Sequence, residues 1–124
     1  MNENEIITEF LIESNENLSR LDREIVDLER SPKDAALLSS IFRTIHTIKG
    51  TCGFLGFSTM ELVAHHAETI LSQLREGERE LTPDLVSLVL QAIDIVKSEL
   101  TSVEQTSAES GNSYPELAAR LQAA

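Results

Sequence analysis

Apolar residues recur at steps of three and four along almost the whole 124-residue chain. That spacing is the period of an amphipathic α-helix, and no segment alternates apolar and polar residues as a half-buried strand does. The three prolines and most of the five glycines fall between the periodic segments, where such residues mark turns. The sequence therefore predicts an all-α fold.

The turn residues divide the first half of the chain into two helices. The first is expected from about Asn4 to Arg30. Ser31 is expected to cap the second helix, with Pro32 at its first position. Gly56 should end that helix in a left-handed conformation.

Two further helices are expected in the second half. Ser58 and Glu61 have the spacing of a capping box and open the third helix, which Gly77 ends. Thr82 and Pro83 provide a cap and a first helical position for the fourth.

Four amphipathic helices with short connections predict an antiparallel up-and-down four-helix bundle over residues 1–104. Residues 105–112 are rich in small polar side chains and are expected to form a flexible link. Residues 113–124 are expected to form a short fifth C-terminal helix, the start of a linker to further domains. The residues expected in the core are Ile7, Phe10, Leu11, Leu18, Leu21, Ile25, Leu28, Leu38, Ile41, Phe42, Ile45, Ile48, Cys52, Leu62, Val63, Ala67, Ile70, Leu71, Leu74, Leu85, Val86, Leu88, Val89, Ile93, Val96 and Leu100.

Charge and composition exclude several classes of partner. A net charge of −11 argues against binding to nucleic acid or to an anionic membrane surface. The longest apolar runs are too short for a membrane span, and the first residues lack the pattern of a signal peptide. Because Cys52 is the single cysteine, no disulfide framework exists, and a cytoplasmic location is expected.

The second helix carries an unusual group of residues on one edge. His46, Lys49 and Gly50 lie three and four positions apart, so all three project along that edge, and His46 should be partly exposed beside the apolar stripe. A glycine inside a helix costs about 1 kcal/mol relative to alanine. Gly50 and Gly53 therefore need a reason, and clearance for a partner approaching His46 is one.

An exposed histidine with these neighbours suits acceptance of a phosphoryl group. The attacking ring nitrogen must be unprotonated, and a carboxylate on the other nitrogen fixes the tautomer and raises basicity. Glu68 could supply that carboxylate, and Lys49 a cation that offsets the charge of the phosphoryl group. The active site of the partner protein that closes over the histidine must supply its own metal ion and acidic residues.

Other chemistries fit the sequence less well. A histidine is more often structural than catalytic, and His66 falls nearer the apolar face than His65, which shares an edge with Glu68. A metal-binding bundle would need repeated Glu-x-x-His pairs, whereas the one pair here runs in the opposite order. Cys52 falls on the apolar phase of its helix, and no glycine-rich nucleotide motif occurs.

The run from His46 to Gly50, followed by Gly53 to Phe57, resembles the signature of histidine phosphotransfer (HPt) domains. More narrowly, it is similar to the N-terminal phosphotransfer domain of the chemotaxis histidine kinase CheA. The similarity spans nearly the whole chain and includes Ile41-Phe42-Arg43, His65-x-x-Glu68, Ile70-Leu71, Leu81 and the final helix. His66 departs from the small or apolar residue that is more usual at its position.

The resemblance implies an HPt fold and a phosphorelay function. His46 would be phosphorylated by the ATP-binding catalytic domain of a CheA-like kinase, generally in trans within a dimer. It would then give the phosphoryl group to an aspartate of a response regulator receiver domain of the CheY or CheB type. Lys49, His65 and Glu68 would form the hydrogen-bonding surround of His46, with Gly50 leaving clearance.

The same resemblance implies that this domain holds no cofactor and no catalytic or ATP site of its own, since ATP and Mg belong to the kinase domain. Two alternatives remain open: a stand-alone HPt protein of a multistep phosphorelay, and a metal-binding helical bundle.

Overall fold

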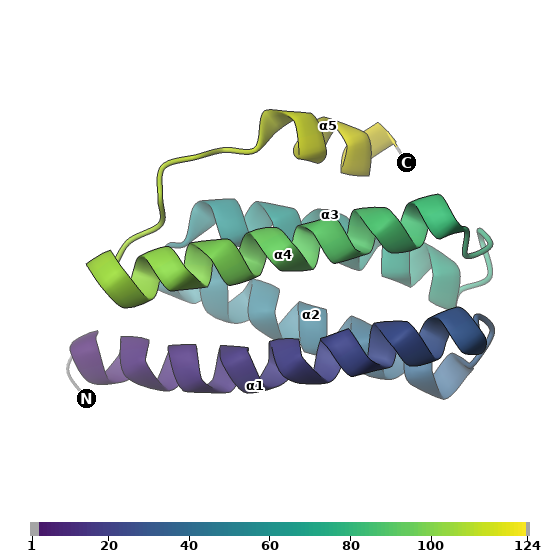
Figure 1. Ribbon diagram of the computed structural model, residues 1–124, viewed down its shortest axis with the longest axis horizontal. Coiled ribbons are helices and arrows are strands. Elements are labelled where there is room, and N and C mark those ends of the chain that lie inside the picture. Colours follow the sequence, from purple (N-terminus) through teal and green to yellow (C-terminus); the bar gives the residue numbers. More distant parts are fainter. Residues whose placement is uncertain (1–2, 124) are drawn as a thin grey trace.

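Four long helices form an antiparallel bundle, and a short fifth helix packs on its side (Figure 1). The computed structural model describes residues 3–123. Within them the helices are α1 (Glu3–Arg30), α2 (Ala35–Leu55), α3 (Ser58–Arg75), α4 (Pro83–Thr106) and α5 (Pro115–Ala123). No strand occurs among the described residues. The prediction of an all-α up-and-down bundle with a short C-terminal helix is confirmed.

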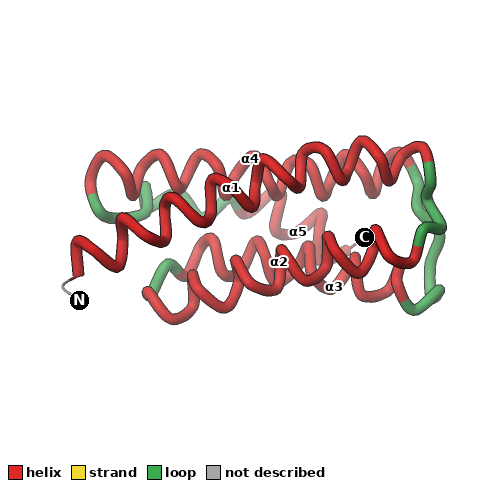
Figure 2. The backbone as a smooth tube through the Cα atoms, turned by 90° about the horizontal axis from the view of Figure 1, so that it is seen from below, coloured by secondary structure: helices red, strands yellow, loops and turns green. Residues whose placement is uncertain are grey.

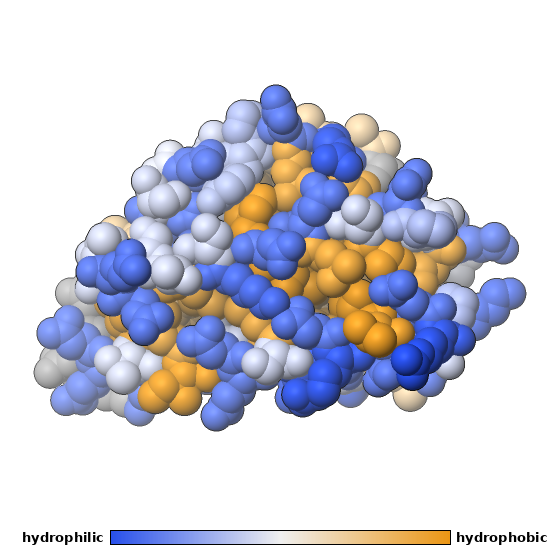
Figure 3. Space-filling model, viewed as in Figure 1, coloured by the Kyte–Doolittle hydropathy of each residue, from blue (hydrophilic) through white to orange (hydrophobic). Residues whose placement is uncertain are grey.

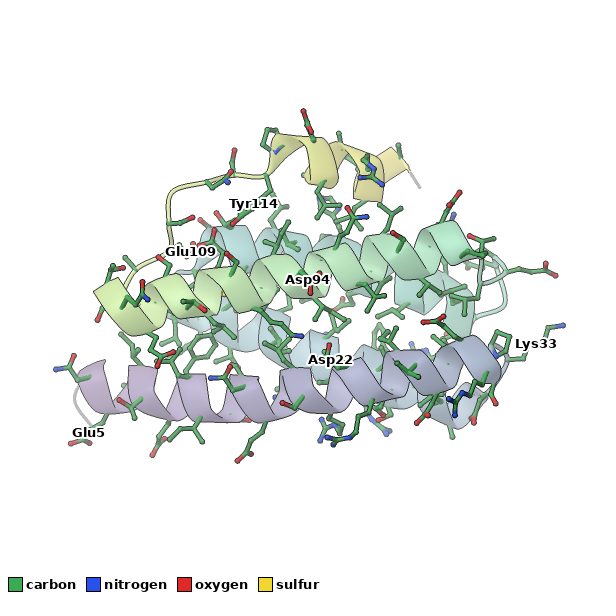
Figure 4. All side chains as sticks on the ribbon, viewed as in Figure 1. Glu5, Asp22, Lys33, Asp94, Glu109 and Tyr114 are labelled. Atoms are coloured by element: carbon green, nitrogen blue, oxygen red, sulfur yellow. The ribbon has the colours of Figure 1, made fainter. Side chains whose placement is uncertain are left out.

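The four long helices close into a ring around one core. α1 packs on α2 and α4, and α3 packs on the same two helices, while α5 packs on α3 and α4. The connecting turns gather at the two ends of the bundle (Figure 2). Asp22 on α1 faces α4, where the ammonium of Lys97 donates to its carboxylate at 2.6 Å (Figure 4).

The core contains nearly all of the residues that the apolar periodicity predicts. Leu11, Phe42 and Val86 lie half-buried at its edge. The prediction of Leu62 as a core residue is wrong, because its side chain is 48% exposed. It projects from a different side of α3 than the buried stripe that contains Val63. Polar side chains cover much of the face seen in Figure 3, with apolar side chains visible between them.

The start of α2 differs from the prediction. Asp34, not Ser31, is the N-cap, and its carboxylate accepts a hydrogen bond from the backbone N–H of Leu37 at 3.1 Å. The N–H of Ser31 instead closes the end of α1 by donating to the carbonyls of Asp27 and Leu28. The end of α2 is as predicted, because Gly56 adopts the left-handed conformation with φ of 80°.

The start of α3 also differs. Ser58 lies inside the helix, and the N-cap position, Phe57, makes no side-chain capping bond. The carboxylate of Glu109, on the segment between α4 and α5, accepts from the N–H groups of Thr59 and Met60 at 3.2 and 2.8 Å (Figure 4). A carboxylate at this position satisfies two free donors and complements the positive end of the helix dipole. The capping box predicted from Ser58 and Glu61 is therefore wrong.

The ends of the other helices follow the turn residues closely. α3 ends at Arg75, and Gly77 adopts a left-handed φ of 75° in the following turn. Thr82 caps α4 as predicted, accepting from the N–H of Leu85 at 3.2 Å. α4 continues to Thr106, two residues into the segment expected to be a link.

The segment after α4 is attached to the bundle by buried polar contacts. Glu99 is fully buried, and its carboxylate accepts from the backbone N–H and the hydroxyl of Ser110 at 2.8 and 2.7 Å. Leu117 and Leu121 of α5 are buried against the bundle. The flexibility of residues 105–112 and the domain limits at 104 and 112 stay predictions. Over residues 3–123, no helix is both long and apolar enough to cross a membrane.

Candidate functional site

His46 lies in the middle of α2, on the outer edge of the helix. Its neighbours Ile45 and Ile48 are buried in the core, and the 3.6-residue period turns the histidine toward solvent. Its side chain is 60% exposed. The predicted partial exposure of His46 is confirmed.

Glu68 on α3 bonds directly to His46 on α2. Nδ1 of His46 lies 2.7 Å from Oε2 of Glu68. Because an ionised carboxylate only accepts hydrogen bonds, Nδ1 must be the donor. A neutral imidazole that carries its proton on Nδ1 has a free lone pair on Nε2, so the contact leaves Nε2 as the nucleophilic atom.

Lys49 occupies the other oxygen of the same carboxylate. Its Nζ donates to Oε1 of Glu68 at 3.0 Å. Burial alone would raise the pKa of Glu68, but hydrogen bonds and electrostatic interactions with Lys49 and His46 lower the pKa below its usual value. The carboxylate is therefore ionised at neutral pH, and Lys49 holds it rather than contacting the imidazole.

An aromatic ring and a guanidinium extend the site. The rings of Phe42 and His46 are nearly parallel, with an interplanar angle of 10° and centroids 6.0 Å apart. Cζ of Arg75 lies over the Phe42 ring, 4.0 Å from its centroid. Neither residue is predicted at the site from the sequence, because Phe42 is expected in the core and Arg75 has no expected role. Helical spacing held a signal for each: Phe42 is four positions before His46, and Arg75 seven after Glu68.

The two glycines of α2 differ in what surrounds them. A Cβ atom on Gly50 would meet no atom within 4 Å, so the helix edge beside His46 is open there. A Cβ atom on Gly53 would instead meet the carboxylate of Glu61. The expected clearance at Gly53 is therefore taken by a side chain of this chain, and that expectation is corrected.

The other two histidines lie on α3, three and two positions before Glu68. The exposed ring of His65 has its centroid 5.9 Å from that of His66. Among the described residues, no hydrogen bond joins the His65 ring to His46, Lys49 or Glu68, and its supporting role stays a prediction. His66 is half-buried, and its pKa is lowered by burial and then by the neighbouring His65.

Among the described residues, the groups considered for thiol or metal chemistry are not arranged as His46, Lys49 and Glu68 are. Cys52 is fully buried, and burial together with the charges of Glu109 and Glu61 raises the pKa of its thiol to about 12. This confirms Cys52 as a core residue, since its reactive thiolate is strongly disfavoured. Within residues 3–123, no three His, Cys, Asp or Glu side chains are gathered so that they could hold a metal ion.

Comparison with known proteins agrees with this geometry. Residues 5–106 match the family model described as "Hpt domain". A relative in Helicobacter pylori, the sensor histidine kinase CheAY, is 40% identical over 108 residues. That match covers 87% of this chain but only 13% of the relative, so the chain spans a small part of that protein's length.

Two solved structures share the fold. The CheA phosphotransferase domain from Thermotoga maritima is 31% identical, with a TM-score of 0.80, and the match covers 83% of this chain and 98% of that one. The phosphorylated P1 domain of CheA3 from R. sphaeroides, solved in complex with CheY6, has a TM-score of 0.86 at 24% identity. This second match covers 96% of this chain and 94% of that one, and it bears on the fold alone. With a family model matched over residues 5–106, the chain belongs to the Hpt domain family, and it is similar to the phosphotransfer domains of CheA kinases.

Proposed function

We propose that Nε2 of His46 accepts a phosphoryl group and passes it to an aspartate of a response regulator. The observation that carries this proposal is the contact between Nδ1 of His46 and Glu68 at 2.7 Å. It assigns the ring proton to Nδ1 and leaves the lone pair of Nε2 free on a side chain that is 60% exposed.

The proposed first step is attack by Nε2 on the γ-phosphorus of ATP. The N–P bond forms while the bond between that phosphorus and the bridging oxygen of ADP breaks, and ADP leaves with the electron pair. The imidazole becomes positive as the bond forms. The ionised carboxylate of Glu68, bonded to Nδ1–H, stabilises that charge as a carboxylate does in hydrolytic triads.

The second step reverses the chemistry with another acceptor. A carboxylate oxygen of the regulator's aspartate attacks the phosphorus, the N–P bond breaks, and its electron pair returns to Nε2. The Nδ1–H bond to Glu68 is kept throughout, so His46 is ready for another cycle.

The neighbouring residues have supporting roles in this proposal. Lys49 holds the Glu68 carboxylate in place through its bond to Oε1. We propose that its positive charge also offsets the charge of the incoming phosphoryl group. Gly50 leaves the open edge that a partner's active site needs in order to close over His46. His65 is proposed as part of the hydrogen-bonding surround once the phosphoryl group is bound, since its exposed ring lies on the same helix as Glu68.

The partners proposed for this chain are a CheA-like kinase domain and a receiver domain. The kinase domain would act in trans and supply ATP and Mg, which this domain does not bind. The relative in Helicobacter pylori, 40% identical over 108 residues, is a sensor histidine kinase named CheAY, which supports a kinase domain of the CheA type as one partner. Because ATP would be the phosphoryl donor, we propose a cytoplasmic location. The similarity to CheA kinases supports a role in chemotaxis-like signalling.

The proposal is tested by incubating the domain with a CheA catalytic fragment and ATP labelled at the γ-phosphate. A phosphohistidine is labile in acid and stable in base, so the label should show that pattern. It should then move to an added CheY-type receiver domain. Absence of label would contradict the proposal, and bound metal in place of label would favour a metal-binding bundle.

A further inference from the structure

The imidazole of His46 needs more than one contact to be held in position. The hydrogen bond from Nδ1 to Glu68 fixes one atom of the ring, but the ring plane remains free to tilt about that bond. Transfer requires the Nε2 lone pair to be aligned with the P–O bond that breaks, and small misalignments slow such reactions strongly. A second contact on the ring would remove this freedom.

Phe42 provides such a contact. Its ring lies within 10° of parallel to the imidazole, with the centroids 6.0 Å apart, which is an offset-stacked arrangement. Phe42 is itself half-buried against the core and one helical turn from His46 on α2. The tilt of the imidazole is therefore limited by a ring that the core anchors.

Arg75 holds Phe42 from the neighbouring helix. Its guanidinium carbon lies 4.0 Å from the Phe42 ring centroid, well within the range of a cation–π contact. The contact of Arg75 with Glu76 is longer, at 3.7 Å, and Glu76 is largely exposed, so that pair is weak. The Phe42 ring is thus the better-defined partner of Arg75.

We infer that Phe42 and Arg75 are positioning residues that set the orientation of the His46 imidazole for phosphoryl transfer. Together with Glu68, they hold the exposed ring from α2 and α3: the hydrogen bond to Glu68 fixes Nδ1, the stack with Phe42 fixes the plane, and Arg75 holds Phe42. The inference deepens the proposed function and depends on His46 being the phosphoacceptor.

The test uses a small phosphoryl donor, phosphoramidate, so that docking of a protein partner plays no part. Nε2 of His46 attacks the phosphorus, the N–P bond to His46 forms, and the P–N bond of the donor breaks. Ammonia leaves with the electron pair and takes up a proton from water. The rate of uptake then reports the readiness of the imidazole itself.

For Phe42, the variant is Phe42→Leu, which keeps an apolar side chain but removes the ring. Its matched control is Phe54→Leu, at an 83% exposed phenylalanine on the same helix. We expect Phe42→Leu to take up phosphoryl groups about three- to tenfold more slowly and Phe54→Leu to match the unmodified chain. Phe42→Tyr keeps the ring and should take up phosphoryl groups at the rate of the unmodified chain. This variant keeps the inference testable if Phe42→Leu does not fold.

For Arg75, the variant is Arg75→Met, which removes the charge but keeps an apolar stem. The control is Arg120→Met on α5, which changes the net charge equally and removes a hydrogen bond to Gln91 far from His46 in the sequence. We expect Arg75→Met to slow uptake about three- to tenfold and Arg75→Lys to recover part of the rate. Arg120→Met should have no effect.

A second readout separates positioning from general stability. The second measurement follows the exchange of the Nδ1 proton of His46 with water by NMR. We expect this exchange to be faster in Phe42→Leu and Arg75→Met. The melting temperatures of both variants should stay close to that of the unmodified chain. Unchanged uptake and unchanged exchange would overturn the inference. Slower transfer from the kinase domain alone, with normal uptake from phosphoramidate, would also overturn it, because the two residues would then dock the partner. If the unmodified chain takes up no phosphoryl group from either donor, the proposed function itself fails.

Discussion

Glu68 bridges His46 and Lys49, with one carboxylate oxygen 2.7 Å from Nδ1 of His46 and the other 3.0 Å from Nζ of Lys49. The two contacts join α3 to α2 beside the exposed imidazole of His46. One carboxylate therefore sets the tautomer of His46 and the position of the nearest cation.

Removing the negative charge of Glu68 should make His46 a weaker acceptor of the phosphoryl group. In Glu68→Gln the amide oxygen can still accept from Nδ1, but it cannot neutralise the imidazole as the N–P bond forms. We expect phosphorylation by a CheA catalytic fragment to slow about 10- to 100-fold. Glu61→Gln, at an exposed carboxylate on the same helix, is the control. Equal rates in the two variants would remove Glu68 from the mechanism.

Adding a methyl group at Gly50 should separate stability from transfer. Gly50→Ala meets no atom within 4 Å and raises helix propensity, so the free energy of unfolding should stay equal or rise by up to about 1 kcal/mol. Transfer from the kinase domain should slow, because the methyl stands one turn from His46 on the open edge. Gly56→Ala is the contrast, since a left-handed φ of 80° should make it destabilising. Full transfer with a bulky residue at position 50 would show that the open edge is not needed.

Removing the distant cap of α3 should destabilise the bundle. Glu109→Ala leaves the N–H groups of Thr59 and Met60 without their carboxylate, and the loss of such a cap costs about 0.5–2 kcal/mol. Urea denaturation measures the change. Glu104→Ala, at an exposed residue of α4, should change stability little. The cap would be unimportant if the two variants unfolded at the same urea concentration.

The lowered pKa of His66 predicts a loss of stability in mild acid. The unfolded chain takes up a proton on His66 near the ordinary value of 6.5, whereas the folded chain does so only at lower pH. The unfolded state therefore binds more protons in this window, and the free energy of unfolding falls as the pH drops from about 6.5 through the folded pKa. His66→Gln should reduce that fall, as measured by denaturation at several pH values. An identical pH profile in the variant would contradict the assignment.

The bundle could be predicted because helical periodicity repeats in every segment, so single errors do not change the result. Helix phase also placed His46 at an exposed edge and Cys52 in the core. Helical periodicity cannot choose between two nearby candidates for the N-cap of α2. Ser31 and Asp34 lie one turn apart, and the backbone N–H of Ser31 closes the end of α1. Helical periodicity also fails at Leu62, an apolar residue that lies off the buried stripe of α3.

Contacts between distant segments could not be predicted from the sequence. Glu109 caps a helix that begins about 50 residues earlier, and nothing in the local pattern around Ser58 indicates this. The same holds for Arg75 on Phe42, which depends on how α2 and α3 pack. The contact between His46 and Glu68 was anticipated because the chemistry of a phosphoacceptor requires a carboxylate, and the structure supplies the geometry.

The role of Nε2 of His46 as phosphoacceptor is tested most directly by locating the phosphorus atom. The domain is labelled with ¹⁵N, phosphorylated by a CheA catalytic fragment and ATP, and examined by NMR for coupling between phosphorus and a ring nitrogen. We expect coupling to Nε2 of His46, with the proton retained on Nδ1. Coupling to Nδ1 of His46, or to a ring nitrogen of His65 or His66, would contradict it.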